Sequence, residues 1–196
     1  MSDEAEAKKS DSKTRLVSLR TGLGDMPFGS DEFLTEEEAA SKGEALSYFK
    51  EGYEAQMRGD LDEAADLYKQ SIEAYPTAEA HTFLGWTYSF LGMIDEAIEE
   101  CHCAIEVDPD FGNPYNDIGA YLIEKGNLED AIIWLERAKM ASRYESYYYP
   151  HFNLGRVYEA RGQVYDAMRE YKMAFELNPD YVVALRAFRL LQGKLN

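Results

Sequence analysis

The chain has 196 residues, of which 45% are hydrophobic, and it carries a formal net charge of -17. This length and composition suit one domain with a core, or a short repeat array with a tail. The negative charge disfavours binding to the backbone of nucleic acids and to anionic membrane surfaces. A neutral or basic protein is therefore the expected partner.

Three features bear on the cellular compartment. No run reaches the roughly 20 apolar residues that a membrane helix needs. Residues 1–6 are acidic and precede no apolar stretch, so they do not resemble a signal peptide. The two cysteines, Cys101 and Cys103, are too few and too close for a disulfide framework. Together these features favour a cytoplasmic protein.

Residues 1–34 lack periodicity and are rich in Ser, Gly, Asp and Lys, which predicts a flexible acidic and polar tail. Two apolar groups interrupt it, at residues 26–28 and 33–34. They belong either to a plain linker, which the composition favours, or to a segment that folds back and masks a binding surface. Thr35 followed by Glu38 matches a capping box, so a helix is expected to begin near Thr35.

From residue 45 onwards, small residues recur in columns that are 33 to 36 positions apart. The first column holds glycine at Gly52, Gly85, Gly119 and Gly155. The second, seven residues later, holds Gly59, Gly92, Gly126 and Gly162. The third holds Ala64, Ala97, Ala131 and Ala167, and most blocks close with proline, at Pro76, Pro109 and Pro179. A period of this length is typical of helical repeats.

Each column has a physical interpretation. A glycine within a helix costs about 1 kcal/mol relative to alanine, so the first column predicts close approach of a second helix. The second column predicts a left-handed residue that ends the first helix. In the first block, Asp60 and Glu63 are expected to cap the second helix. Each block is thus a helix hairpin that must stack on its neighbours.

The third block departs from this pattern. Arg143 stands where the other blocks have proline, and the spacing lengthens through residues 142–149. This predicts a longer second helix or a bend. For the run Tyr147 to Tyr149, an inter-repeat turn packed by aromatic rings is favoured over modification or partner contact. After Pro179, residues 182–193 are expected to form a capping helix, with Arg189 in the glycine column.

These blocks resemble the tetratricopeptide repeat family. The resemblance implies an all-α fold, a right-handed superhelical solenoid of four helix hairpins with a C-terminal capping helix. The expected domain is 35–196, with repeats at about 45–77, 78–111, 112–147 and 148–181.

In that family the first helices of the repeats line a concave groove, and the resemblance implies the same arrangement here. Helical geometry selects the side chains that remain once the packing columns are removed. One set, called the aromatic end below, comprises Phe49, Tyr53, Phe83, Trp86 and Phe90. The other, called the polar end, comprises Asn116, Asp117, Phe152, Asn153 and Arg156. The alternative is that some of the aromatic side chains pack between repeats.

One variant of the family grips the C-terminal carboxylate of heat-shock chaperones with two lysines, two asparagines and an arginine. Aligned from the first block, this chain instead has Phe49, Tyr53, Phe83, Asn113 and Asp117. Aligned from the second block, it has Thr82, Trp86, Asp117, Tyr149 and Asn153. Neither set neutralises a carboxylate, so this partner is not expected.

No catalytic residues, cofactor or metal are predicted. Cys101, His102 and Cys103 point about 100° apart on a helix and do not converge on one ion. His81 and His151 share a column with tyrosines, which predicts a packing role. The glycines follow the repeat and form no phosphate loop.

The sequence therefore predicts a scaffold or adaptor, not an enzyme, that binds a peptide or helical segment of another protein. Two alternatives stay open: an acidic chaperone for a secreted or assembly-prone client, and a structural protein that self-associates.

Overall fold

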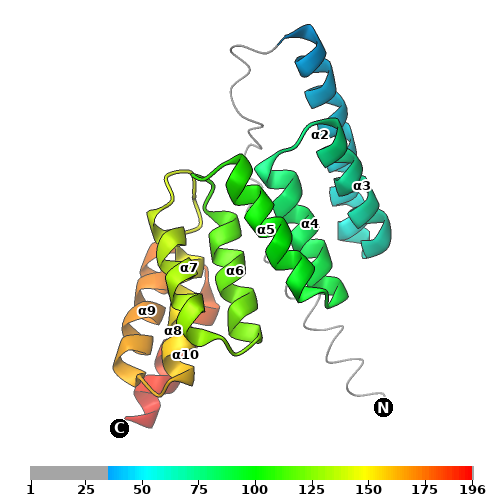
Figure 1. Ribbon diagram of the computed structural model, residues 1–196. Helices are drawn as coiled ribbons and strands as arrows, with labels where there is room; N and C mark the ends of the chain where they lie inside the picture. The colour runs from blue at the N-terminus through cyan, green and yellow to red at the C-terminus, as the bar shows by residue number, and fades with distance from the viewer. Residues whose placement is uncertain (1–34, 196) are drawn as a thin grey trace, which may run out of the picture. The chain divides into compact units, whose positions relative to one another are not determined.

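Helices make up most of residues 35–195, the part of the chain that this computed structural model describes. Within that part nine helices follow one another and no strand is present (Figure 1). Their bounds are α2 Glu36–Arg58, α3 Leu61–Ala74, α4 Ala78–Leu91, α5 Ile94–Val107, α6 Asn113–Glu124, α7 Leu128–Met140, α8 Tyr148–Ala160, α9 Val164–Leu177 and α10 Val182–Lys194. The predicted all-α fold is confirmed.

The helices group into two units, residues 1–100 and 101–196, and α5 belongs partly to each. The first unit contains the hairpin of α2 and α3, followed by α4. The second contains the hairpins α6–α7 and α8–α9, followed by α10. The predicted tail, and its fold-back alternative, lie outside the described residues.

The predicted start of the first helix is confirmed. The Glu38 amide donates to the Thr35 hydroxyl at 3.2 Å, and the Thr35 amide donates to the Glu38 carboxylate at 2.9 Å. This capping box satisfies two helix-end groups and begins a helix of 23 residues. The helix ends at Gly59, whose φ of 90° lies in the left-handed region, as do those of Gly92, Gly126 and Gly162.

The first glycine column marks close contact between the two helices of a hairpin, as predicted. A Cβ atom added at Gly52 would lie 3.0 Å from the Tyr68 ring. At Gly119 it would lie 2.6 Å from Leu135, and at Gly155 it would lie 2.5 Å from the Tyr171 ring. The space that a side chain would need is therefore filled by a large residue of the second helix.

The capping helix α10 packs on the last hairpin. Its buried Leu191 clusters with Ala167 and Tyr171 of α9, and Phe188 packs against the same cluster. The opposite face is exposed and includes Arg189, which occupies the glycine column. No second helix within the described residues approaches this position, so a long side chain is tolerated there.

The predicted cap at the start of α3 is wrong. Asp60 makes no side-chain hydrogen bond to the helix. Instead Arg58 donates to Asp60 at 3.0 Å and to Glu63 at 3.2 Å. The carboxylates of Asp60 and Glu63 therefore pair with the Arg58 guanidinium, at the end of the preceding helix. The capping-box pattern does not include this arginine.

The third junction contains an ordered loop. The prediction of a longer second helix is wrong, because α7 has 13 residues and ends at Met140. The loop that follows pairs with the end of the preceding block: the Gly112 amide donates to the Arg143 carbonyl at 3.0 Å, and the Arg143 amide donates to the Asp110 carbonyl at 2.9 Å. The Arg143 guanidinium also binds the Asp108 carboxylate at 2.7 Å.

Aromatic packing holds this loop, as predicted for the tyrosine run. Tyr144 is buried, its ring lies 5.3 Å from that of Tyr147, and burial raises its pKa well above the ordinary value. The Tyr147 hydroxyl donates to the Ala141 carbonyl at 2.8 Å. Tyr148 and Tyr149 begin α8, and their rings contact that of Tyr181 at 5.0 and 5.5 Å.

Replacing Gly119 by alanine is expected to destabilise the protein, because the new methyl group would collide with the Leu135 side chain. Overpacking of this kind costs about 1–3 kcal/mol, which outweighs the higher helix propensity of alanine. Urea denaturation followed by circular dichroism measures the change.

Gly43→Ala is the matched control, because Gly43 also lies within a helix but has no atom within 4 Å of an added Cβ. It is expected to stabilise the protein by about 0.5–1 kcal/mol. A Gly119→Ala protein as stable as the wild type would contradict the proposed role of the glycine column.

Candidate functional site

The aromatic end lies on α2 and α4 in the first unit, where Phe83 is its central residue. The Phe83 ring lies 4.9 Å from Phe49, 6.0 Å from Tyr53 and 4.6 Å from Trp86, between ring centroids. It also contacts Tyr68 of α3 at 5.8 Å. Edge-to-face and tilted ring contacts at these distances stabilise a rigid aromatic cluster.

Two residues of the aromatic end are not surface residues. Phe49 is completely buried and Phe83 is only 8% exposed. Tyr53, Trp86 and Phe90 are partly exposed. The periodicity places all five on related helix faces, but Tyr68 and Leu84 close over the two phenylalanines within the same core cluster. Any contact with a partner therefore falls to Tyr53, Trp86 and Phe90.

The polar end lies on α6 and α8 in the second unit, where four of its side chains form a continuous chain of hydrogen bonds. Arg156 donates to the Asn153 side chain at 3.0 Å, and Asn153 donates to that of Asn116 at 3.0 Å. Asn116 then donates to the Asp117 carboxylate at 3.3 Å. This chain, called the polar ladder below, joins the first helices of two repeats.

The polar ladder is buried at one end and accessible at the other. Asn116, Asp117 and Asn153 are 8%, 9% and 6% exposed, whereas Arg156 is partly exposed. Hydrogen bonds within the ladder hold the two amide side chains in one orientation. Burial is the main reason for the raised pKa of Tyr144, and the negative charge of Asp117 raises that pKa further.

Phe152, the fifth residue of the polar end, packs against neighbouring aromatic side chains. Its ring lies 5.5 Å from Tyr171 of α9 and 5.2 Å from Tyr181, and the side chain is partly buried. Phe152 therefore supports α8 beside the ladder.

Models of the tetratricopeptide repeat match residues 44–78 and 78–111. Residues 44–111 of the chain therefore consist of tetratricopeptide repeats. A curated relative is the photosystem I assembly protein Ycf3 of Prochlorococcus marinus, 28% identical over 111 residues. That match covers 51% of this repeat protein and 64% of Ycf3, so it spans less than two thirds of the relative.

Solved structures show the same fold. PilF of Pseudomonas aeruginosa superposes with a TM-score of 0.74 at 22% identity, covering 79% of this chain and 70% of PilF. The first TPR of Spaghetti (RPAP3), bound to the HSP90 peptide SRMEEVD, superposes with a TM-score of 0.58 at 22% identity. That match covers 62% of this repeat protein and 98% of the Spaghetti domain.

Two side-chain hydrogen bonds that join the two helices of a repeat were not predicted from the sequence. The buried Tyr68 hydroxyl donates to Gln56 at 2.7 Å, and the Tyr171 hydroxyl donates to Glu159 at 2.8 Å, each across a spacing of 12 residues. The repeat columns contained a signal for these hydrogen bonds. Tyr68 and Tyr171 occupy one column, and their acceptors, Gln56 and Glu159, occupy another. In the third repeat these columns hold Leu135 and Ile123, an apolar pair that needs no hydrogen bond.

His81 and His151 have a role that the packing prediction missed. His81 lies 2.7 Å from Glu100, and His151 lies 2.7 Å from Glu170, each across 19 residues and between the two helices of one repeat. In both pairs the contact joins Nδ1 of the histidine to a carboxylate oxygen of the glutamate. The recurring spacing of 19 residues was the signal available in the sequence.

The residues around Cys101 also have defined positions. Cys101 is buried, and the His102 ring lies 5.2 Å from that of Trp134 in an edge-on contact. The His102 side chain therefore points toward α7 and packs there. No helix within residues 35–195 combines the length and apolar character needed to span a membrane.

Replacing Glu170 by glutamine is expected to destabilise the repeat protein at neutral pH. Burial opposes ionisation of Glu170, but the hydrogen bond from His151 and the charges of Lys139 and Arg169 outweigh it and lower its pKa below 4.5. A lowered pKa contributes stability that is present above pH 4.5 and is lost as pH falls through the folded value. Removing the carboxylate is therefore expected to cost about 1–3 kcal/mol near pH 7.

Urea denaturation at several pH values between neutral and acid tests this expectation. The Glu170→Gln protein should lose less stability on acidification than the wild type. Glu176→Gln is the control, because the exposed Glu176–Lys172 pair at 3.4 Å is worth about 0.5 kcal/mol or less. Parallel pH curves for wild type and Glu170→Gln would refute the assignment.

Proposed function

We propose that this repeat protein is a non-enzymatic scaffold or adaptor that binds a peptide or helical segment of another protein on the first helices of its repeats. The polar ladder is the observation that carries the proposal. It presents an accessible guanidinium, at Arg156, next to amide groups that are already oriented by one another. Asparagine side chains of this kind match the donor and acceptor pattern of a peptide backbone.

The accessible rings of the aromatic end supply a different kind of contact. Tyr53 and Trp86 rest on the buried Phe83, which gives them a rigid base. Large aromatic side chains on a rigid support lose little entropy on binding and are typical anchors of protein interfaces. Tyr53, Trp86 and Phe90 therefore bind apolar side chains of the partner.

The partner is proposed to differ from the HSP90 peptide held by the Spaghetti domain. A C-terminal carboxylate is best neutralised by several cations, whereas the polar ladder contains one, Arg156, and also contains the Asp117 carboxylate. The net charge of -17 further favours a neutral or basic segment.

Substitutions in both sets test the proposal. A random peptide library displayed on phage is selected on the full chain, and the affinities of enriched peptides are measured by fluorescence anisotropy. Trp86→Ala and Arg156→Ala, which alter partly exposed side chains, are each expected to weaken binding about tenfold, equivalent to about 1.4 kcal/mol. Phe83→Ala is unsuitable, because truncating a buried phenylalanine costs about 3–5 kcal/mol of stability.

Arg169→Ala is the control for Arg156→Ala, because Arg169 is an exposed arginine of α9 that pairs with Asp166 at 2.7 Å. Arg156→Ala should weaken binding and Arg169→Ala should not, while circular dichroism confirms that both proteins keep their helices. Equal affinities for Trp86→Ala, Arg156→Ala and wild type would refute the proposed surfaces.

A second candidate is a chaperone that assists an assembly-prone client, and the match to a photosystem I assembly protein supports it. The two functions differ in their effect on the partner. A client's solubility should depend on co-expression of a chaperone, whereas the partner of a scaffold stays soluble without it. Self-association, the third alternative, predicts a concentration-dependent mass in sedimentation.

A further inference from the structure

A histidine, a glutamate and a cysteine come together in the second repeat. His81 of α4 lies 2.7 Å from Glu100 of α5, and Cys103 follows Glu100 by one turn of the same helix. A ring nitrogen, a carboxylate oxygen and the thiol sulfur all lie within 4.8 Å of one another. Among residues 35–195 this is the one group of three such ligands, and it is called the His–Glu–Cys cluster below.

Helix geometry explains why these three side chains converge. Residues three apart on a helix lie on one face, so Glu100 and Cys103 project from neighbouring positions of α5. The contact between His81 and Glu100 brings the imidazole to that face. The consecutive run Cys101, His102 and Cys103 does not converge, because adjacent side chains diverge by about 100°. The partners of Cys103 therefore come from one turn earlier and from the other helix of the repeat.

The three atoms of the cluster are those that Zn²⁺ prefers. Zinc binds imidazole nitrogen, carboxylate oxygen and thiolate sulfur at about 2.0–2.3 Å, in a tetrahedral arrangement. At these bond lengths the ligand atoms lie roughly 3.3–3.8 Å apart. A separation of at most 4.8 Å thus closes by small side-chain rotations. Mg²⁺ and Ca²⁺ prefer oxygen ligands throughout, so a set with nitrogen and sulfur selects against them.

The cluster is partly shielded but remains within reach of an ion from solvent. The side chains of His81 and Glu100 are 12% and 22% exposed, and Cys103 is also partly exposed. Partial burial strengthens the attraction between a cation and the two negatively charged ligands, carboxylate and thiolate. Three protein ligands leave a fourth position for water, as in open zinc sites.

The fourth repeat contains the same pair without the thiol. His151 lies 2.7 Å from Glu170, and the position one turn after Glu170 holds Met173. In the third repeat Tyr115 and Trp134 occupy the two columns, with ring centroids 6.0 Å apart. The histidine–glutamate contact therefore belongs to the architecture of two repeats, whereas the thiol beside it is particular to the second.

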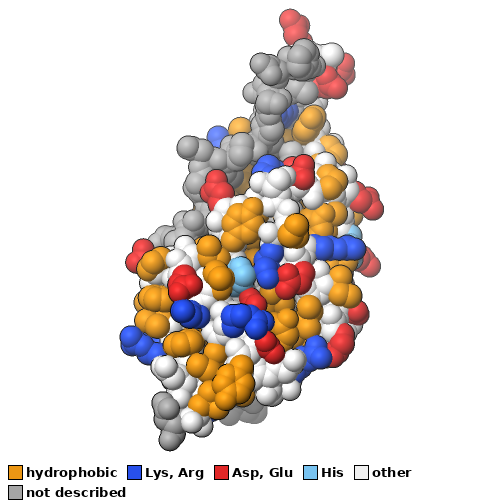
Figure 2. Space-filling view, turned by 90° about the vertical axis from the view of Figure 1, so that its left-hand side faces the viewer, with side chains coloured by type: hydrophobic (Ala, Val, Ile, Leu, Met, Phe, Trp, Pro, Cys, Tyr) orange, Lys and Arg blue, Asp and Glu red, His pale blue; other side chains and the backbone are white. Residues whose placement is uncertain are grey.

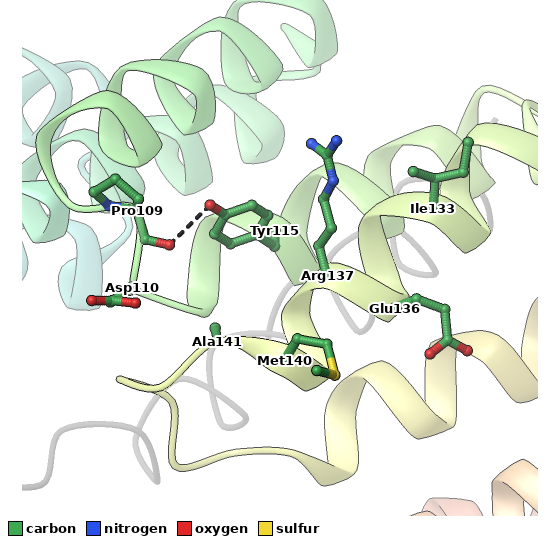
Figure 3. Close-up of a pocket in the computed structure, with 8 residues that line it drawn as sticks. All are labelled: Pro109, Asp110, Tyr115, Ile133, Glu136, Arg137, Met140 and Ala141. Carbon is green, nitrogen blue, oxygen red and sulfur yellow. Dashed lines mark hydrogen bonds between the residues drawn. The ribbon is translucent and has the colours of Figure 1, made fainter.

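The pocket of about 480 Å³ beside α7 has no comparable set of ligands (Figure 3). Its two carboxylates, Asp110 and Glu136, lie on opposite sides in that view. Glu136 pairs with Lys139 at 3.0 Å, and the cationic Arg137 belongs to the same lining. Charges of both signs therefore border this pocket, and they favour neither a cation nor an anion.

We propose that His81, Glu100 and Cys103 bind one Zn²⁺ ion. The thiol loses its proton on binding, because the thiolate is the form that coordinates zinc. The ion then joins α4 to α5 and stabilises the folded second repeat by mass action. The site does not depend on the function proposed above, because it shares no residue with the aromatic end or the polar ladder.

Metal titration of the full chain, without an affinity tag and with a non-thiol reductant present, tests the proposal. Isothermal titration calorimetry is expected to show one Zn²⁺ bound per chain. Co²⁺, used as a spectroscopic probe, is expected to give the charge-transfer absorption of a thiolate ligand. Cys103→Ser should abolish that absorption and weaken Zn²⁺ binding about tenfold or more, because even loss of a partner of a metal ligand costs about 10–100-fold.

Two further variants serve as matched comparisons. Cys101→Ala removes the buried cysteine of the same helix and should leave the Co²⁺ absorption unchanged. Met173→Cys places a thiol one turn after Glu170 and should create a second site, which raises the stoichiometry to two ions per chain. Circular dichroism establishes that each variant keeps its helices. A single site in Met173→Cys would show that the three ligands do not suffice, and would contradict the proposal.

Adsorption of cations on the acidic surface gives a different result. On the face shown in Figure 2, acidic side chains are scattered among basic and hydrophobic ones. Ions held by single exposed carboxylates bind weakly and do not depend on a cysteine. Binding of several ions that Cys103→Ser leaves unchanged would overturn the proposal, as would a wild-type protein that binds no Zn²⁺.

Discussion

In the first, third and fourth repeats, the contact between a glycine of the first helix and a large side chain of the second determines how closely the two helices pack. Tyr68, Leu135 and Tyr171 fill the space beside Gly52, Gly119 and Gly155, at distances that no additional carbon atom fits. Glycine weakens the first helix by about 1 kcal/mol, and the close packing of the two helices offsets that cost. Because this face of the first helix is used for packing, its other face carries the side chains for which we propose a binding role.

The same contact explains which polar groups lie inside the repeats. A tyrosine against the glycine brings a hydroxyl into the core, and a buried hydroxyl without a partner is costly. Gln56 and Glu159 supply the acceptors for Tyr68 and Tyr171. Where leucine replaces tyrosine, in the third repeat, the acceptor position is apolar. The identity of one packing residue thus determines the chemistry of a second position 12 residues away.

The third junction shows how the fold accommodates a departure from the repeat. Without a proline, the chain after α7 continues as a loop, and Arg143 anchors that loop to Asp108 of the preceding block. Tyrosines fill the space under it, and Tyr144 is buried. Tyr144 and Tyr147 pack with Tyr115, Ala138 and Ala141, so α6, α7 and the loop share one apolar cluster. Irregular segments held by a rigid scaffold are frequent sites of function.

The sequence by itself determined the features that depend on local chemistry: the repeat period, the helix hairpins, the capping box at Thr35 and the left-handed glycines. It also placed Asn116 and Asn153 on the first helices of two repeats. Tertiary structure decided the rest. Periodicity gives the face on which Phe49 lies but not its depth, which depends on rings from other helices. The histidine–glutamate pairs and the loop at Arg143 likewise join residues far apart in the chain, and only packing brings such groups within hydrogen-bonding distance.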